Sequence, residues 1–328
     1  MTRVTVLMAV YNAANTITEC IQSILNQTFP DFKVIVLNDL STDNTVELIK
    51  AFQSDKIEIV NFKKKGFINA LNTGLGLCDT EYIVRMDSDD IMLTNKLEEQ
   101  VRFMDANQHI VAAGSYVETF GKYKRRWTRF STGTEQVKRN FFWFNSINNP
   151  SSIIRRKVIV ENNILYKRPY AFIDGDKDYA LAEDYKFWRD LLKVGNLTNI
   201  PKVLLRYRIH DAQAGIAKKR AQDAVARKIR REGLMDFIAS YGINLSEIKT
   251  SAHKISLFNQ LKTLQVKKKD KWHLVMSQYM LIQSTPELKF WRFLVLILTS
   301  NLMLDRNRLE LLWKMIIVKV GVSKKIMI

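Results

Sequence analysis

Cysteine is scarce in this chain of 328 residues, which contains only two. Cys20 and Cys78 cannot build the disulfide framework of a small secreted domain, so we expect both to be buried apolar residues of a cytosolic protein. A hydrophobic share of 47% suits a folded protein and argues against disorder. At this length the chain can bury one large core or two smaller ones.

Long hydrophobic runs and a secretory signal are missing as well. The chain begins Met1-Thr2-Arg3 and enters at once an apolar stretch, 4–10, that predicts a buried strand and has no small-residue cleavage site after it. The longest apolar run, Phe293–Leu304, is interrupted by three polar residues and is too short to span a bilayer. We therefore expect a cytoplasmic protein.

Negative charge is scarce in the last third of the chain. Residues 218–328 contain 22 Lys and Arg but only 8 Asp and Glu, so they carry +14 of the total net charge of +18. A basic surface attracts an anionic partner, which could be nucleic acid or the anionic face of a membrane, or it is simply solvated. No nucleic-acid-binding motif accompanies the charge, so we expect no nucleic acid partner, and a basic nucleic-acid-binding protein is kept only as an alternative.

Strand and helix signals alternate through the first part of the chain, which predicts a mostly parallel α/β sheet covered by helices on both faces. The expected strands are 4–10, 32–37, 57–62, 81–86, 110–117, a short one at 151–154, and 203–209. The expected helices are 16–27, one containing 46–52, then 66–77, 93–104, 135–144 and 182–194. We expect surface loops at 121–133 and 170–179. Beyond about 214 the signals are helical and basic, so we divide the chain into domains at 1–213 and 214–328.

The most informative stretch is the carboxylate cluster that follows the fourth expected strand. Asp87, Ser88, Asp89 and Asp90 stand directly after this strand, and in open α/β sheets ligands bind outside the carboxyl ends of strands. Asp87 and Asp89 could hold one Mg²⁺ or Mn²⁺, with substrate phosphates completing the ligand shell. An acidic turn that caps the next helix would explain the same residues, Asp90 above all. After the second strand, Asp39 could accept hydrogen bonds from a base or a ribose.

Taken together, these stretches resemble glycosyltransferase family 2, which has the GT-A fold, a Rossmann-like sheet flanked by helices. The resemblance covers residues 3–213 and rests on the order and spacing of its motifs. Those motifs are Val4–Asn12, Gln27-Thr28, Asn38–Thr45, Gly66–Gly74, Asp87–Asp90, Arg155-Arg156, Ala182–Trp188 and Tyr207–His210.

The resemblance implies an inverting, metal-dependent transfer of a sugar from a UDP-sugar to a glycan acceptor. It implies that Asp87 and Asp89 bind the metal ion, Mn²⁺ or Mg²⁺, on the diphosphate, with Asp89 the more direct ligand. It also implies a set of residues around the nucleotide: Ala9, Tyr11, Asn12, Asp39, Asn69, Arg85 and Ser88. Arg208 could meet the diphosphate, because a guanidinium suits phosphate oxygens. His210 could ligate the metal or a phosphate, or it is structural.

By the same resemblance, Glu183 and Asp184 open a helix next to the acceptor. Asp184 would be the general base that takes the proton of the acceptor hydroxyl, and Glu183 would orient the acceptor or share that role. Acidic residues at a helix N-terminus are also favoured by the macrodipole, which would explain the pair without any chemistry. We expect Phe187 and Trp188, on the same helix, to belong to the core.

A narrower resemblance concerns the substrates. Ala182–Trp188 and Lys202–His210 resemble bacterial transferases that add N-acetylglucosamine or N-acetylgalactosamine to lipooligosaccharide, which implies a UDP-N-acetylhexosamine donor. The implied acceptor is a glycan or glycolipid, such as the terminal galactose of lipooligosaccharide or another surface polysaccharide. Many relatives have His-Pro-Ser where this chain has Asn149-Pro150-Ser151, and the amide cannot carry a proton there. The alternative enzyme is a capsule- or chondroitin-type chain-elongating transferase.

The basic tail alternates apolar clusters and basic residues over 288–317. An amphipathic basic helix can lie in a membrane interface, which would place the enzyme peripherally at the inner face of the cytoplasmic membrane, beside a lipid-linked acceptor. The core of a small helical domain or an oligomer contact would explain the apolar residues equally well.

Overall fold

The computed structural model describes residues 2–64, 66–122, 125–127, 130–141, 144–167, 173–174, 177–178, 181–211, 213 and 219–239. The chain divides into two compact units, Met1–Gly233 and Leu234–Ile328. The basic clusters predicted over 288–317 lie outside the described residues, as does most of the predicted helical region, of which 219–239 is described. The division predicted at 213/214 stays a prediction. No helix in the described ranges is long and apolar enough to cross a membrane.

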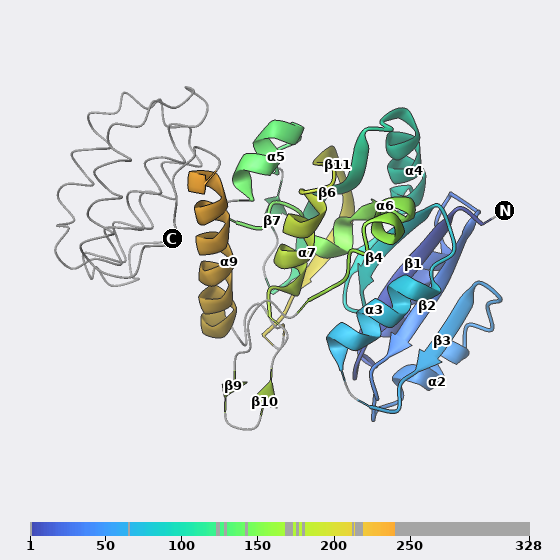
Figure 1. Ribbon diagram of the computed structural model, residues 1–328. Coiled ribbons are helices and arrows are strands. Elements are labelled where there is room, and N and C mark those ends of the chain that lie inside the picture. The colour runs from blue at the N-terminus through green and yellow to red at the C-terminus, as the bar shows by residue number, and fades with distance from the viewer. Residues whose placement is uncertain are drawn as a thin grey trace. The chain divides into compact units, whose positions relative to one another are not determined.

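One sheet of nine strands organises the described part of the first unit (Figure 1). Its first half is parallel, in the spatial order β3-β2-β1-β4. These strands are β1 (Val4–Val10), β2 (Phe32–Asn38), β3 (Ile57–Asn61) and β4 (Tyr82–Asp87). In the register of this half, Ala9 pairs with both Leu37 and Asp87. The carboxyl ends of β1, β2 and β4 therefore meet at one edge, as the predicted ligand site requires.

The second half of the sheet is mixed. From β4 the order continues β8-β6-β11-β5, with β7 paired to β6, and only β6 and β11 run parallel to each other. The strands are β5 (Ile91–Met92), β6 (Ile110–Gly121), β7 (Arg125–Trp127), β8 (Ile153–Arg155) and β11 (Asn196–Ile209). A separate antiparallel pair consists of β9 (Ile173–Asp174) and β10 (Lys177–Asp178).

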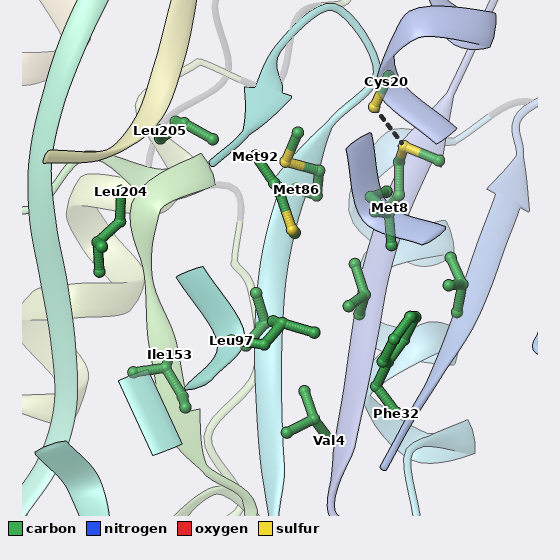
Figure 2. Packing of buried hydrophobic residues seen from close by; sticks show 14 of the residues in the cluster. Val4, Met8, Cys20, Phe32, Met86, Met92, Leu97, Ile153, Leu204 and Leu205 are labelled. Carbon is green, nitrogen blue, oxygen red and sulfur yellow. Dashed lines mark hydrogen bonds between the residues drawn. The ribbon is translucent and has the colours of Figure 1, made fainter. Parts of the chain in front are cut away.

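Helices pack on both faces of the sheet, and β1 shows why. Its side chains alternate, so Val4, Val6 and Met8 enter one core cluster while Leu7 enters the other. The first cluster is closed by α1 (Ile17–Leu25), α2 (Thr45–Lys50) and α4 (Lys96–Ala106). The second is closed by α3 (Phe67–Leu77), α5 (Thr134–Asn140), α6 (Arg156–Glu161), α7 (Glu183–Leu191) and α9 (Lys219–Ala239). Figure 2 shows the first cluster, where the thiol of Cys20 lies 3.7 Å from the sulfur of Met8.

The fold class expected from the sequence, a Rossmann-like α/β sheet flanked by helices, is confirmed, but the sheet is mixed and not mostly parallel, because β5, β7 and β8 pair antiparallel. Cys20 and Cys78 are free and buried, and the side chains of Phe187 and Trp188 lie in the second core cluster, both as expected. The expected surface loops at 121–133 and 170–179 were wrong in part, because the first contains β7 and the second contains β9 and β10. These short strands depend on partners elsewhere in the chain, which local patterns do not reveal.

Candidate active site

The turn after β4 is fixed from two sides. On one side α1 holds its backbone, because the hydroxyl of Thr16 donates to the carbonyl of Ser88 at 3.0 Å. On the other side Asp90 is fully buried, and its Oδ1 accepts the backbone N–H of Arg208 at 2.8 Å. Asp90 therefore ties the turn to β11 and does not cap α4, the role considered for it from the sequence. Burial, then the charges of Asp89 and Asp87, raise the pKa of Asp90 well above its usual range.

Asp89 of this turn is in contact with His210. Oδ2 of Asp89 lies 2.9 Å from Nε2 of His210, and both side chains remain partly accessible. Among the residues that the structure describes, no group of three or more His, Cys, Asp or Glu side chains could hold a metal ion by itself. The donor set nevertheless fits a divalent ion that takes its other ligands from phosphate and water. Two neighbouring ligands of an octahedral ion, each about 2.1 Å from it, stand about 3 Å apart.

Asp87, the last residue of β4, sits between opposite charges. Its Oδ1 lies 3.9 Å from Nη2 of Arg85, whose side chain is only 1% exposed. Desolvation of the carboxylate, then the charges of Asp89 and Asp184, raise the pKa of Asp87 to about 6, although the charge of Arg85 opposes the shift. Asp87 is thus a carboxylate that a cation would help to ionise.

Arg85 is buried next to Asp87. Its Nη1 donates to the carbonyl of Leu7 at 2.8 Å, and its guanidinium lies 5.9 Å from the centre of the Tyr166 ring. Because so little of this side chain is accessible, its visible effect is electrostatic, on Asp87. A direct contact between Arg85 and the nucleotide stays a prediction.

The residues predicted to hold the nucleotide gather at the ends of β1 and β2. The backbone N–H of Thr42 donates to Oδ1 of Asn12 at 2.8 Å, and Tyr11 beside it is exposed. Asp39 is buried, and its Oδ1 accepts the N–H of Gly66 at 2.9 Å, so it joins the end of β2 to the start of α3. Half-buried Ala9 lies on β1, and exposed Asn69 lies in the first turn of α3. The structure brings these residues to one edge, and their contact with a nucleotide stays a prediction.

The acidic pair Glu183 and Asp184 begins α7, directly after Ala182, which has a left-handed backbone with φ of 54°. Oδ2 of Asp184 accepts a hydrogen bond from Nδ2 of Asn145 at 2.7 Å, and Oδ1 accepts the N–H of Tyr185 at 2.7 Å. Burial raises the pKa of Asp184. Burial first, then the charge of Asp184, raise the pKa of Glu183 to about 8. Arg85, which lies 3.9 Å from Asp87, also lies 5.9 Å from the centre of the Tyr166 ring, and that ring stacks on Phe187 at 4.1 Å, so α7 and the end of β4 are linked through these side chains.

Arg208 is engaged within the protein. Its Nε donates to the carbonyl of Asp89 at 2.7 Å, its guanidinium forms an ion pair with Glu19, and it lies 4.4 Å from the centre of the Phe120 ring. Arg208 therefore fastens the acidic turn to α1 and β11. A contact with the diphosphate stays a prediction.

Two residues of the site were missed by the sequence reasoning. Lys96 is fully buried and donates from Nζ to the carbonyl of Pro150 at 2.8 Å; burial lowers its pKa to about 7. Its helical spacing from the buried Gln100 and Met104 was a usable signal, because residues four apart share a face. Asn145, which bonds Asp184, had no such signal, because it stands in an irregular polar segment.

Comparison with known proteins decides the family. The family model described as Glycosyl transferase family 2 matches residues 5–168. An uncharacterized glycosyltransferase of Haemophilus influenzae is 32% identical over 287 residues, which cover 84% of this chain and 86% of that protein. The chain belongs to glycosyltransferase family 2. It is therefore a glycosyltransferase, and the matched residues include Asp39, Asp87, Asp89 and Asn145.

Solved structures agree with the fold of this family 2 glycosyltransferase. Residues 1–349 of S. aureus TarS, in complex with UDP-GlcNAc, align with a TM-score of 0.58 at 18% identity, covering 87% of this chain and 82% of that one. The mannosyltransferase PcManGT of Pyrobaculum calidifontis, in complex with GDP-Man and Mn²⁺, aligns with a TM-score of 0.52 at 17% identity, covering 98% and 81%. At these identities the likeness shows the GT-A fold.

Proposed function

We propose that this glycosyltransferase moves N-acetylglucosamine or N-acetylgalactosamine from a UDP-sugar to a glycan acceptor, with inversion and with a divalent metal ion. One observation carries the proposal. The turn with Asp87 and Asp89 and the helix start with Glu183 and Asp184 are linked by contacts: Arg85 lies 3.9 Å from Asp87 and 5.9 Å from the ring of Tyr166, and that ring stacks on Phe187 of α7. Inverting transfer needs two such groups, one to hold a metal and one to accept a proton.

The two groups divide the chemistry. Asp87, Asp89 and His210, together with phosphate oxygens of the donor, would hold Mn²⁺ or Mg²⁺, and the ion would neutralise charge on the departing diphosphate. Asp184 accepts the proton of the acceptor hydroxyl while that oxygen forms its bond to the anomeric carbon and the bond to the diphosphate oxygen breaks. Attack from the face opposite the leaving group inverts the anomeric configuration. Glu183, protonated below its pKa of about 8, orients the acceptor with a hydrogen bond.

The substrates follow from resemblance and from the solved neighbours. TarS, which shares the fold, was solved with UDP-GlcNAc, and PcManGT was solved with Mn²⁺. These complexes support a nucleotide-sugar donor and a divalent ion in this chain. The segments 182–188 and 202–210 support an N-acetylhexosamine donor and a galactose-terminated acceptor, such as lipooligosaccharide or another surface polysaccharide.

The test is transfer by the purified protein. We expect product from UDP-GlcNAc or UDP-GalNAc and a galactose-terminated acceptor with Mn²⁺, loss of product with EDTA, and recovery when Mn²⁺ is restored. Asp184→Asn should lower kcat by at least about a hundredfold, because an amide cannot take a proton. Asp79→Asn is the matched control, since exposed Asp79 pairs with Lys33 instead. Full transfer by the Asp184→Asn enzyme would show that Asp184 is not the general base.

We also propose an anionic membrane surface, at the inner face of the cytoplasmic membrane, as a partner. Helix α9 supports it: Arg220, Arg227 and Arg231 are all exposed, and spacings of 7 and 11 residues place them on one helix face. Buried Val225 and Ile229 lie on the opposite face, against the core. The three arginines thus form a basic stripe that points away from the first unit's core, and each could contribute about 1 kcal/mol near an anionic surface.

Vesicle sedimentation tests this partner. We expect vesicles with anionic lipid to retain the protein better than neutral ones, and the change of all three stripe arginines to Gln to reduce that retention. The control changes three exposed basic residues of other helices to Gln: Lys50, Arg102 and Lys157. Equal retention by anionic and neutral vesicles would contradict the proposal.

A further inference from the structure

One amide from outside α7 holds the carboxylate of Asp184. Nδ2 of Asn145 donates to Oδ2 at 2.7 Å, while the backbone N–H of Tyr185 donates to Oδ1 at 2.7 Å. Each carboxylate oxygen therefore accepts one fixed hydrogen bond. Because each oxygen can accept two, a lone pair on each remains for an acceptor hydroxyl.

The amide of Asn145 is itself oriented. Its Oδ1 accepts the backbone N–H of Ile147 at 3.3 Å, so the NH₂ end is the one that faces Asp184. The segment that carries it is anchored to β11, because Nδ2 of Asn199 donates to the carbonyl of Ser146 at 3.0 Å. Ser146 and Ile147 are both buried. Asn145 is thus a rigid donor, placed by contacts that do not involve α7.

The surroundings of Asp184 oppose its ionisation, so the hydrogen bond from Asn145 is needed to stabilise the carboxylate. The ionisable groups that act electrostatically with Asp184 come from α7, β4, β11 and the segment before α7: Glu183, Asp87, Arg85, Tyr207 and Tyr166. Burial favours the neutral acid, whereas the hydrogen bonds from Tyr185 and Asn145, and then the charge of Arg85, favour the carboxylate. A base that must accept a proton has to start as the carboxylate.

We propose that Asn145 is a positioning residue that makes Asp184, and not its neighbour Glu183, the proton acceptor of the transfer reaction. The proposal rests on the function proposed above. The hydrogen bond fixes the rotamer of Asp184 and stabilises its negative charge. The carboxylic acid of Glu183, which carries the proton of the pair, is left to donate a hydrogen bond to the acceptor.

The experiment measures transfer against pH for the full-length wild type and two variants. Asn145→Ala should lower kcat by about tenfold or more, as expected for a lost hydrogen bond to a charged group, and leave the KM for the UDP-sugar unchanged. The acidic limb of kcat/KM should move up by about one pH unit, because the carboxylate loses a donor. Asn145→Asp is nearly isosteric and should move the limb further, because a second negative charge then faces Asp184.

Asn199→Ala is the control for a merely structural role. It weakens the anchor of the same segment but keeps the amide that bonds Asp184, so it should lower the Tm and move the acidic limb less than Asn145→Ala does. The proposal is overturned if both Asn145 variants keep the wild-type pH profile, or if Asn199→Ala shifts the limb as far as Asn145→Ala does. An inactive wild type, or full activity of Asp184→Asn, would instead count against the proposed function.

Discussion

Nε2 of His210 lies 2.9 Å from Oδ2 of Asp89, although the two residues follow different strands in different halves of the sheet. Asp89 belongs to the turn after β4, and His210 comes directly after β11. The backbone N–H of Arg208 bonds the neighbouring Asp90 and its Nε bonds the carbonyl of Asp89, so three contacts tie the end of β11 to the acidic turn. The parallel half of the sheet alone would not complete this side of the site.

The first prediction concerns metal affinity. His210→Gln should weaken Mn²⁺ binding in the presence of UDP by about tenfold, because a nitrogen ligand is lost. The EPR signal of free Mn²⁺ during a titration measures this. His109→Gln removes an exposed histidine from the turn between α4 and β6 and serves as the control. If the His210 variant binds Mn²⁺ as tightly as the wild type, the imidazole is structural.

The pH dependence of metal binding is the second prediction. A metal ligand must be deprotonated, and the pKa of Asp87 is raised to about 6 in the free protein. Mn²⁺ affinity should therefore fall as the pH is lowered through about 6, and the EPR titration repeated between pH 5 and 8 measures the fall. The His210→Gln protein should keep this dependence if Asp87 causes it. A dependence that disappears with His210 would assign the proton to the imidazole.

Local patterns reveal the parallel half of the fold and the acidic turn, because both depend on neighbours in sequence. The apolar run at 4–10 is β1, and the carboxylates of Asp87 and Asp89 stand where an apolar strand ends. The mixed half depends on distant pairing: the short strand expected at 151–154 overlaps β8, but no local pattern shows that β8 pairs with both β4 and β6. The bond between Asn145 and Asp184 likewise joins residues 39 positions apart, and only the folded sheet brings them together.

The third prediction concerns Glu183, whose pKa is raised from the ordinary 4.5 to about 8. Between these values the unfolded chain loses the proton first, so raising the pH across this window lowers the stability of the folded state. Glu183→Gln removes that loss and should raise the Tm at pH 8 by about 2–4 °C, with little change at pH 4. Calorimetry at both pH values measures it, with exposed Glu58→Gln on β3 as the control for a lost charge.

The fourth prediction concerns the activity of the same Glu183→Gln variant. Glutamine keeps a hydrogen-bond donor and cannot ionise, so it imitates protonated Glu183. Transfer at pH 7 should stay within about tenfold of the wild type, whereas Asp184→Asn should be nearly inactive. Initial rates with saturating donor give the comparison. If the two variants lose activity equally, Glu183 and Asp184 share the proton.

The last prediction compares two glycines of α3 that lie two residues apart. A Cβ on Gly74 would stand 2.6 Å from Cδ1 of Leu7 and from Cδ1 of Leu37, both fully buried, so α3 approaches β1 and β2 closely at this point. A Cβ on Gly76 meets nothing within 4 Å. Gly74→Ala should therefore lower the free energy of unfolding by about 1–3 kcal/mol, the usual cost of overpacking.

Gly76→Ala should raise the free energy of unfolding by up to about 1 kcal/mol, because alanine favours the helix more than glycine does. Urea denaturation of both variants measures the pair, with the midpoint compared at equal m-value. The first turn of α3 carries Asn69, and Gly66 at the start of the helix donates to Asp39. If the added Cβ displaces α3, both residues move, so the Gly74→Ala protein should also bind UDP more weakly. Equal midpoints for the two variants would mean that α3 shifts with no loss of stability. The close packing at Gly74 would then not be what positions Asn69.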